Sequence, residues 1–333
     1  MSNQFFLNNT GPQGPPGPQG PAGVVAPGNV WTARLPANYY DWRGLAWSKE
    51  LGLFVSTSIS GVGNRVMVSN DGISWTAVAT PADNQWFSVA WSGSLGRFVA
   101  VAISGVGNRV MYSNNGTNWT LGVSPADNNW RSVIWVEELG LFVAVSASGV
   151  GNRTMRSADG INWVIGVTPV DNDWTSLAWS KELGLMVAVA SSGVGNRTMR
   201  SADGINWVIG VSPIDNDWRA ITWSGPKGLF VAVSITGTDN RAMYSSDGIN
   251  WFLGFSAADN NWYGVTYSDE MGMFVAVGGV VTSLVNNKCM ISYDGIVWSS
   301  RFTNSRIQPS NVVWAKELNR FVSTCAQGPL MTS

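Results

Sequence analysis

The sequence predicts an all-β protein: a seven-bladed β-propeller of about 44 residues per blade, preceded by a short collagen-like stalk. Three observations lead to this prediction. Tryptophans recur every 44 residues, each repeat holds four strand-like segments, and the pieces missing from the last repeat occur at the start of the chain. Four strands in about 40–45 residues are typical of a propeller blade. We divide the chain into an expected anchor peptide (1–10), the stalk (11–23) and the propeller (24–333).

Three series of tryptophans define the repeat and account for all 19 of them. The first series is Trp42, Trp86, Trp130, Trp174, Trp218 and Trp262. The second is Trp47, Trp91, Trp135, Trp179, Trp223 and Trp314, with Tyr267 in the sixth place. The third is Trp31, Trp75, Trp119, Trp163, Trp207, Trp251 and Trp298. A three-residue insertion near 283–287 displaces the last members of the second and third series. Because the second series has seven members, we expect seven inner strands.

Each repeat contains four short strand candidates. In the second repeat they lie at 88–92, 98–102, 109–113 and 118–121. They are rich in β-branched and aromatic residues and are separated by Gly, Asn, Asp and Pro, which favour turns. Nothing in the repeats shows a sustained helical period, so the fold is expected to be built from strands alone.

The two ends of the chain complete one blade between them. The last repeat stops at residues 330–333, before its turn and its fourth strand. Those pieces are found near the N-terminus, where Gly28 and Trp31 precede Gly72 and Trp75 by one repeat length. We therefore expect the strand around Trp31 to pair into the last blade. Such closure removes two exposed sheet edges, which would otherwise favour aggregation.

The stalk consists of strict G-X-Y triplets. Glycine occupies every third position from Gly11 to Gly23, and proline fills five of the eight intervening positions. Only glycine fits at the crowded axis of a collagen triple helix. The segment is therefore expected to form a homotrimer, or alternatively a stiff polyproline linker without partner chains.

Composition excludes several classes of function. Only 12% of the residues are charged, and 20 Lys and Arg balance 21 Asp and Glu, so no basic surface for nucleic acid is expected. The chain has no histidine, which is the commonest general base and metal ligand. The two cysteines, Cys289 and Cys325, are interpreted as buried thiols. No metal site and no cofactor are therefore expected.

The sequence also gives no sign of a membrane segment. No apolar run approaches the roughly 20 residues that a membrane span needs. The first residues have no basic segment and too short an apolar core for a secretion signal. We expect a protein that is made in the cytoplasm without a signal peptide and is not inserted in a membrane.

A turn motif, S-x-D-G-x-x-W, recurs in five repeats, and a sixth copy carries Asn115 in place of the aspartate. It resembles the Asp-box (BNR-type) repeat of sialidase-like propellers, and the resemblance covers roughly residues 28–333. The resemblance implies that the motif forms the hairpin between the third and fourth strands and that its aspartates are structural. These are Asp71, Asp159, Asp203, Asp247 and Asp294. The sequence lacks one residue that the commonest sialidase form has between Asp and Gly.

The strand order of that family places two kinds of loop on the face opposite these turns, and their polar residues are the candidate ligand-binding groups. The arginines are Arg65, Arg109, Arg153, Arg197 and Arg241. The aspartates are Asp83, Asp127, Asp171, Asp215 and Asp259. In one interpretation, each Arg pairs with an Asp and only holds its loop. In the other, each blade binds a glycan, and the following tryptophans stack on the sugar: Trp86, Trp130, Trp174, Trp218 and Trp262.

No catalytic residues are expected. A sialidase needs an asymmetric set of three arginines, a tyrosine nucleophile and acidic partners, whereas these arginines follow the repeat. The glutamates lie in the turn after the inner strand. That turn is on the face of the S-x-D-G-x-x-W motif, opposite the loops that carry these arginines. The sequence therefore predicts a protein that is not an enzyme.

A virion protein reconciles a collagen-like stalk with the missing secretion signal. Short collagen-like segments ahead of globular heads resemble those of phage tail and head fibres. We expect a fibre or decoration protein on the virion surface, anchored to other virion proteins through residues 1–10, whose propeller adheres to host glycans. The alternatives are a scaffolding head that binds only virion proteins, and a cellular or spore-surface repeat lectin.

Overall fold

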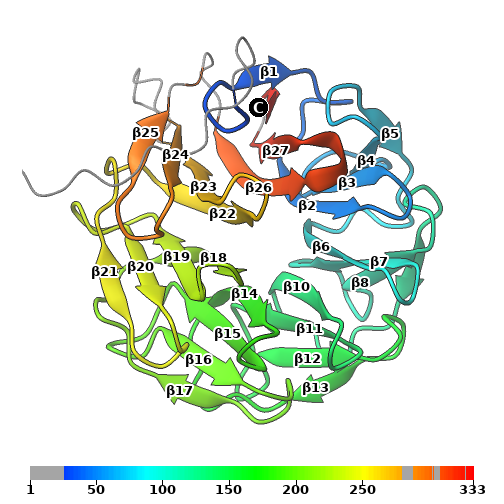
Figure 1. The fold of residues 1–333 in the computed structure, drawn as a ribbon. Coiled ribbons are helices and arrows are strands. Elements are labelled where there is room, and N and C mark those ends of the chain that lie inside the picture. The colour runs from blue at the N-terminus through cyan, green and yellow to red at the C-terminus, as the bar shows by residue number, and fades with distance from the viewer. Residues whose placement is uncertain (1–25, 280–287, 302, 304–307, 327) are drawn as a thin grey trace, which may run out of the picture.

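The computed structural model describes residues 26–279, 288–301, 303, 308–326 and 328–333. In this part of the chain, seven four-stranded antiparallel sheets surround a central opening like the blades of a propeller (Figure 1). The all-β, seven-bladed fold that the sequence predicts is confirmed. The anchor and stalk expected at 1–23 and the insertion near 283–287 lie outside the described residues.

The first three blades run outward from the central opening in chain order. Blade 1 consists of β2 (Trp42–Ser48), β3 (Leu53–Ser58), β4 (Val66–Ser69) and β5 (Thr76–Val78). Blade 2 consists of β6 (Trp86–Ser92), β7 (Arg97–Ala102), β8 (Val110–Ser113) and β9 (Thr120–Gly122). Blade 3 consists of β10 (Trp130–Val136), β11 (Leu141–Ser146), β12 (Thr154–Ser157) and β13 (Val164–Gly166).

The next three blades repeat this order. Blade 4 consists of β14 (Trp174–Ser180), β15 (Leu185–Ala190), β16 (Thr198–Ser201) and β17 (Val208–Gly210). Blade 5 consists of β18 (Trp218–Ser224), β19 (Leu229–Ser234), β20 (Ala242–Ser245) and β21 (Phe252–Gly254). Blade 6 consists of β22 (Trp262–Ser268), β23 (Met273–Gly278), β24 (Cys289–Ser292) and β25 (Ser299–Arg301).

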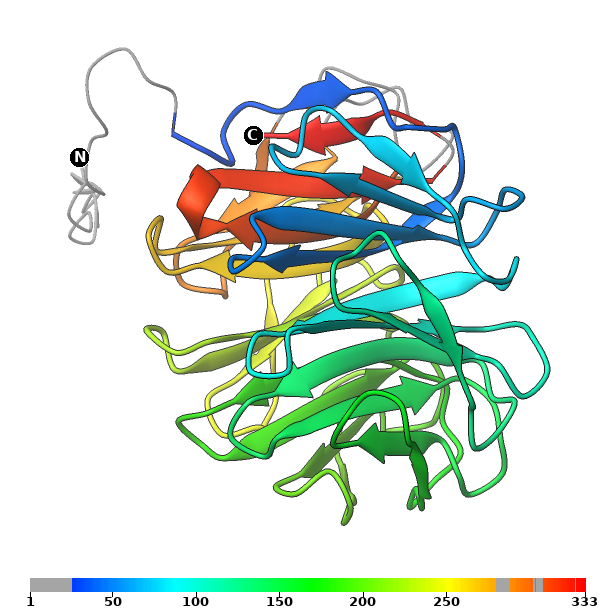
Figure 2. The same cartoon turned by 90° about the vertical axis from the view of Figure 1, so that its right-hand side faces the viewer.

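Blade 7 is shared between the two ends of the chain, as the sequence predicts. Its inner strands are β26 (Pro309–Ala315), β27 (Arg320–Cys325) and β28 (Leu330–Thr332), with the 3-10 helix η1 (Lys316–Leu318) between the first two. Its outer strand is β1 (Thr32–Arg34), which pairs antiparallel with β28. In Figure 2 the blue β1 lies beside the red C-terminal strand. The N-terminal segment thus covers the edge that β28 would otherwise expose.

The core lies between the blades. The second strand of each blade is buried on both faces, and in β7 the five residues after Arg97 are all buried. Trp130, which begins blade 3, packs in one cluster with Val99, Val101 and Val110 of blade 2.

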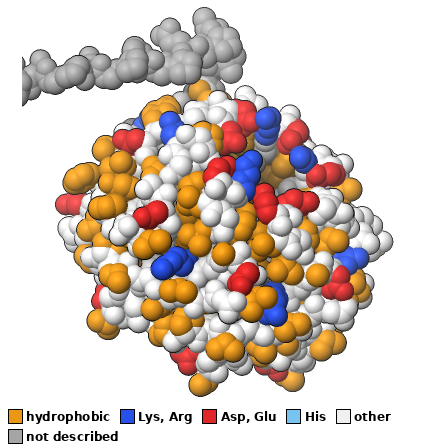
Figure 3. Space-filling model, turned by 60° about the horizontal axis from the view of Figure 1, so that its bottom comes forward, with side chains coloured by type: hydrophobic (Ala, Val, Ile, Leu, Met, Phe, Trp, Pro, Cys, Tyr) orange, Lys and Arg blue, Asp and Glu red, His pale blue; other side chains and the backbone are white. Residues whose placement is uncertain are grey.

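The surface carries both charged and apolar side chains. Figure 3 shows charges of both signs scattered among apolar side chains on the face in view.

The S-x-D-G-x-x-W motif forms the turn between the third and fourth strands. In blade 3, Asp159 Oδ1 accepts hydrogen bonds from the backbone N–H groups of Ile161 and Asn162, both at 2.8 Å, and from the Ser157 hydroxyl at 2.9 Å. Gly160 has a φ of +73°, which disfavours a side chain. A Cβ there would also lie 2.6 Å from Val99 in the preceding blade. The turn thereby contacts the neighbouring blade closely.

Five of the second-series tryptophans form hydrogen bonds to the preceding blade at the ends of the inner strands. Trp179 Nε1 donates to Glu138 of the preceding blade at 2.7 Å, and Trp223 makes the same bond to Glu182. Equivalent bonds join Trp91 to Glu50, Trp314 to Glu270 and Trp47 to Glu317. These glutamates therefore take part in contacts between blades.

The two cysteines, both in the described part of the chain, are free and buried, as expected. Burial raises the pKa of the Cys289 thiol to about 12 and also raises the pKa of Cys325. Both thiols are therefore protonated at neutral pH. No helix among the described residues is long and apolar enough to cross a membrane.

Candidate functional site

The loops lie on two faces of the disc. On the first face, the loop between the second and third strands meets the crossover between blades, as shown by the Gly63 N–H, which donates to Asp83 at 2.6 Å. On the opposite face, the Asn70 side chain of the S-x-D-G turn bonds Gly52, which follows the inner strand. We call these the loop face and the turn face. The arrangement expected from the sequence is observed.

The candidate arginines and aspartates hold the loops of the loop face. Arg109 Nε donates to the Gly105 carbonyl at 2.9 Å, and its Nη1 donates to that of Ile103 at 3.2 Å. Asp127 accepts the Gly107 N–H at 2.7 Å and lies 3.7 Å from Arg109. The other pairs, Arg65–Asp83, Arg153–Asp171, Arg197–Asp215 and Arg241–Asp259, are 3.5–3.7 Å apart.

The first-series tryptophans do not reach solvent, and their expected role in stacking on sugars is wrong. All have an exposed fraction of 0%: Trp42, Trp86, Trp130, Trp174, Trp218 and Trp262. Each indole is enclosed in the core between two blades. For example, Trp130 packs against Val99, and its Nε1 donates to the Ala126 carbonyl at 3.2 Å. Because no indole face is free, these residues stabilise the fold and cannot stack on a ligand.

A different set of side chains reaches the central opening, and a backbone irregularity directs it there. In β2, Trp42 pairs with Ser58 and Gly44 pairs with Thr57, so Arg43 has no partner across the ladder. Such a β-bulge redirects the side chain of the extra residue. Every inner strand has this bulge one residue after its start. The bulge residues are Arg43, Phe87, Arg131, Thr175, Arg219, Tyr263 and Ser310.

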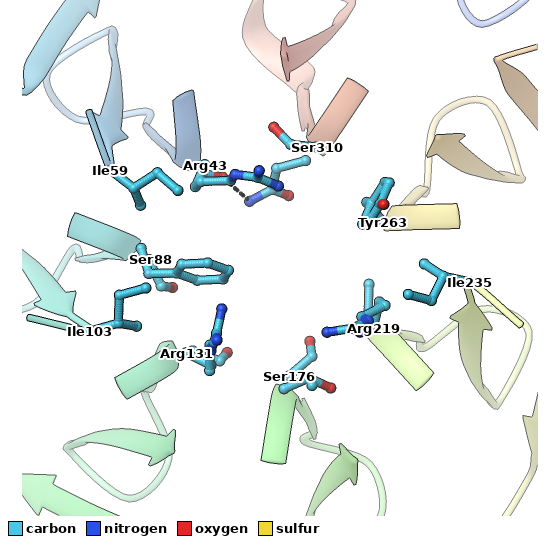
Figure 4. A pocket seen from close by; sticks show the side chains of 15 residues that line it. Arg43, Ile59, Ser88, Ile103, Arg131, Ser176, Arg219, Ile235, Tyr263 and Ser310 are labelled. Carbon is cyan, nitrogen blue, oxygen red and sulfur yellow. Dashed lines mark hydrogen bonds between the residues drawn. The ribbon is translucent and has the colours of Figure 1, made fainter. Parts of the chain in front are cut away.

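All seven bulge residues line one pocket of about 350 Å³ at the centre of the propeller. The pocket lies on the loop face, because Ile59, Ile103 and Ile235 of the second-to-third-strand loops also line it. Figure 4 shows Arg131 and Arg219 extending from their blades toward the centre, with Ser176 between them. We call this the channel-mouth pocket. It brings together side chains from all seven blades.

The three arginines of the channel-mouth pocket differ in their partners. Arg43 forms an ion pair with Asp41, with its Nε 2.7 Å and its Nη2 2.9 Å from the carboxylate oxygens. Arg219 lies 3.7 Å from Asp217, beyond hydrogen-bond distance. Arg131 has no carboxylate within 4.0 Å in the part of the chain that the structure describes, and its guanidinium lies 4.6 Å from the centre of the Phe87 ring.

Burial and then the positive charges of Arg219 and Arg43 lower the pKa of Arg131. Asp173 acts in the opposite direction, but its effect is weaker than the other three. A guanidinium remains charged at neutral pH even when its pKa falls. The centre of the channel-mouth pocket is therefore positive, and it can hold an anion.

Unlike the loop arginines, these three do not follow the repeat. They occur in blades 1, 3 and 5, at a position that other blades fill with Phe, Thr, Tyr or Ser. The sequence does contain a signal: the residue after each first-series tryptophan varies from repeat to repeat. This variation points to a binding site only when the β-bulge that directs these side chains to the central opening is known, and sequence patterns do not specify the bulge. No group of three or more potential metal-ligating side chains occurs among the described residues.

No protein-family model matches the chain, and no curated protein matches its sequence. Solved structures resemble the fold. YCF48 bound to D1 peptide is 15% identical with a TM-score of 0.68, covering 91% of this chain and 94% of that one. YCF48 from Cyanidioschyzon merolae gives the same identity and TM-score, covering 91% and 98%. Virginiamycin B lyase from Staphylococcus aureus is 11% identical with a TM-score of 0.75, covering 91% and 97%. At these identities the likeness establishes the fold alone.

Proposed function

We propose that this protein is a non-enzymatic attachment protein of a virus particle, a fibre or decoration protein whose propeller binds host-surface glycans at the channel-mouth pocket. One observation carries the ligand-binding part. The bulge residues vary between blades, although the repeat around them is kept so closely that 148–167 and 192–211 are identical. Because the bulge residues differ from blade to blade, the pocket that they line is one asymmetric site in place of seven equal ones.

The chemistry of the pocket lining supports binding over catalysis. Its side chains are arginines, hydroxyls, one amide, aromatic rings and aliphatic groups, with no carboxylate and no thiol. General acid–base catalysis depends on a group whose pKa lies near the working pH, and arginine does not meet this condition. The similarity to a lyase concerns the fold, and folds do not determine function.

The virion part of the proposal rests on the arrangement of the chain. A G-X-Y segment precedes a head of nearly zero net charge. Ser157 and Asp159 both accept hydrogen bonds from the turn backbone, which agrees with the resemblance to the Asp-box repeat. A trimeric stalk would present three heads, so that weak single sites add up to firm attachment. Residues 1–10 would then dock to other virion proteins.

A scaffolding head is the second candidate, favoured by exposed apolar side chains at the tips of four consecutive second-to-third-strand loops. These are Val62, Val106, Val150 and Val194, which are 80–89% exposed. Apolar groups on one face are typical of surfaces that contact other proteins. On this interpretation the loop face contacts a neighbouring virion protein and no glycan.

Binding of the labelled full-length protein to candidate host cells tests the proposal, with Arg131→Ala as the pocket variant and Lys181→Ala as the control. Lys181 is on the turn face and its side chain is 69% exposed. We expect binding that soluble glycans inhibit, that Arg131→Ala weakens and that Lys181→Ala leaves unchanged. Folded protein that binds no cell but associates with purified virion proteins would refute adhesion and support the scaffolding head.

A further inference from the structure

We propose that the channel-mouth pocket recognises an acidic sugar residue, with the oxyanion of the sugar, a carboxylate or a sulfate, held by Arg131 and Arg219. This inference rests on the proposed function and specifies the class of glycan. It assigns the specificity to two of the arginines that break the repeat, and leaves the repeated arginines of the loops with their structural bonds.

The distribution of charge supports an anion at this place. The lining of the channel-mouth pocket includes three arginines and no carboxylate. Asp41 neutralises Arg43, but Asp217 is engaged by Arg197 at 3.1 Å and lies farther from Arg219, at 3.7 Å. Asp173 is likewise held by Arg153, at 2.9 Å. Because these two carboxylates form ion pairs with the loop arginines, they compensate the charges of Arg131 and Arg219 only in part.

Uncompensated, partly buried charge has an energetic cost, which an anionic ligand would relieve. Arg131 is half-buried, and its pKa is lowered by burial and by two neighbouring arginines. An oxyanion between Arg131 and Arg219 replaces this repulsion with attraction and accepts charge-assisted hydrogen bonds. The Phe87 ring beside Arg131 restricts the guanidinium before the ligand arrives. Part of the cost of ordering the site is therefore met by the fold.

The remaining lining favours a sugar over a bare ion. Phe87 and Tyr263 supply aromatic rings, and the three isoleucines of the loops supply apolar surface for the ring face of a sugar. Ser132 and the Asn311 amide supply polar groups for its hydroxyls. The volume of about 350 Å³ is at the lower end of the range for small-molecule sites. The pocket is therefore suited to a single acidic sugar at the end of a chain.

Calorimetric titration of the full-length protein tests this inference with four probes: a uronic-acid oligosaccharide, a sulfated neutral-backbone oligosaccharide, an uncharged oligosaccharide of equal length, and inorganic phosphate. We expect at least one acidic oligosaccharide to bind at least 10-fold more tightly than the uncharged one and than phosphate. The carboxylate and sulfate arms distinguish the two sources of the oxyanion. Equal affinity for the charged and uncharged sugars would refute the inference, and phosphate binding as tight as the best sugar would refute its sugar part.

Variants locate the binding. Loss of one charge-assisted contact is expected to weaken acidic-sugar binding about 10- to 100-fold in Arg131→Ala, and less in Arg131→Lys. Because Arg131 also packs over Phe87, Arg219→Ala provides a second test, since Arg219 has no ring contact among the described residues. Lys181→Ala is the matched control. Unchanged affinity in both pocket variants, with unfolding midpoints like that of the parent, would overturn the assignment.

The outcomes separate this inference from the proposed function. Acidic-sugar binding that depends on Arg131, without attachment to any cell, would refute adhesion and support the anion site. Cell attachment that resists acidic competitors and Arg131→Ala would support adhesion and refute the anion site.

Discussion

Replacing the turn aspartates of blades 3, 4 and 5 by asparagine isolates the contribution of their negative charge. The chain already contains the substituted form, because Asn115 occupies the same position in blade 2. Its Oδ1 accepts the N–H groups of Thr117 and Asn118 at 3.0 and 2.8 Å. The triple variant Asp159→Asn/Asp203→Asn/Asp247→Asn is therefore expected to fold with its turns intact.

The magnitude follows from the pKa values of these carboxyls. Burial by itself raises the pKa of Asp159, but the N–H groups of Asn162 and Ile161 outweigh it and lower the pKa from 3.8 to about 2. Asp203 and Asp247 behave in the same way. At 1.36 kcal/mol per pKa unit, a fall of this size corresponds to about 2 kcal/mol per carboxylate before solvent screening. Solvent screens these half-buried groups, so we expect about 1 kcal/mol each and about 3 kcal/mol for the triple variant.

The pH dependence has a definite sign. A carboxyl whose pKa is lower in the folded than in the unfolded state stabilises the fold fully above the unfolded value of 3.8. That stabilisation is lost as the pH falls toward 2. The triple variant should therefore be less stable than the parent at pH 6, and the difference should shrink between pH 4 and pH 2.

Urea denaturation of both proteins at a series of pH values, monitored by tryptophan fluorescence, measures this difference. The asparagine variants also place an amide N–H₂ opposite the side chains that bond Asp Oδ2, such as Asn162. Asp71→Asn is the control, since Ser74 replaces that asparagine in its turn. A deficit of the triple variant that stays constant from pH 6 to pH 2 would show that charge is not the cause.

Three further predictions concern the contacts between blades. Trp130→Ala should lower the free energy of unfolding by about 3–5 kcal/mol, because it empties a fully buried site; near-parental stability would contradict this. Trp179→Phe, measured by urea denaturation, should cost about 1 kcal/mol by removing the hydrogen bond to Glu138, and Glu138→Gln should cost less because it keeps an acceptor. Deleting residues 1–34 exposes the edge of β28; light scattering should then show aggregation and calorimetry a lower melting temperature, whereas an unchanged melting temperature would refute the role of β1.

The candidate site could be predicted from the sequence only in part. The Arg and Asp positions of the loop face were identified, and their pairing was one of the two interpretations. The sequence does not reveal the role of the first-series tryptophans, because a tryptophan that fills a core and one that stacks on a sugar look alike in a sequence. Trp130 shows the difference only in its surroundings, where valines of the preceding blade enclose it.

The sequence by itself determined the number of blades, the closure of blade 7 by β1 and the form of the turns. These features follow from local chemistry repeated along the chain: alternating strands, Asp-Gly turns and a buried tryptophan at a fixed interval. Only the tertiary structure decided where ligands can bind. The channel-mouth pocket joins residues as distant as Arg43 and Ser310, and each enters it through a β-bulge. A bulge depends on the register between two strands, and convergence depends on the closed ring, so neither can be read from one repeat.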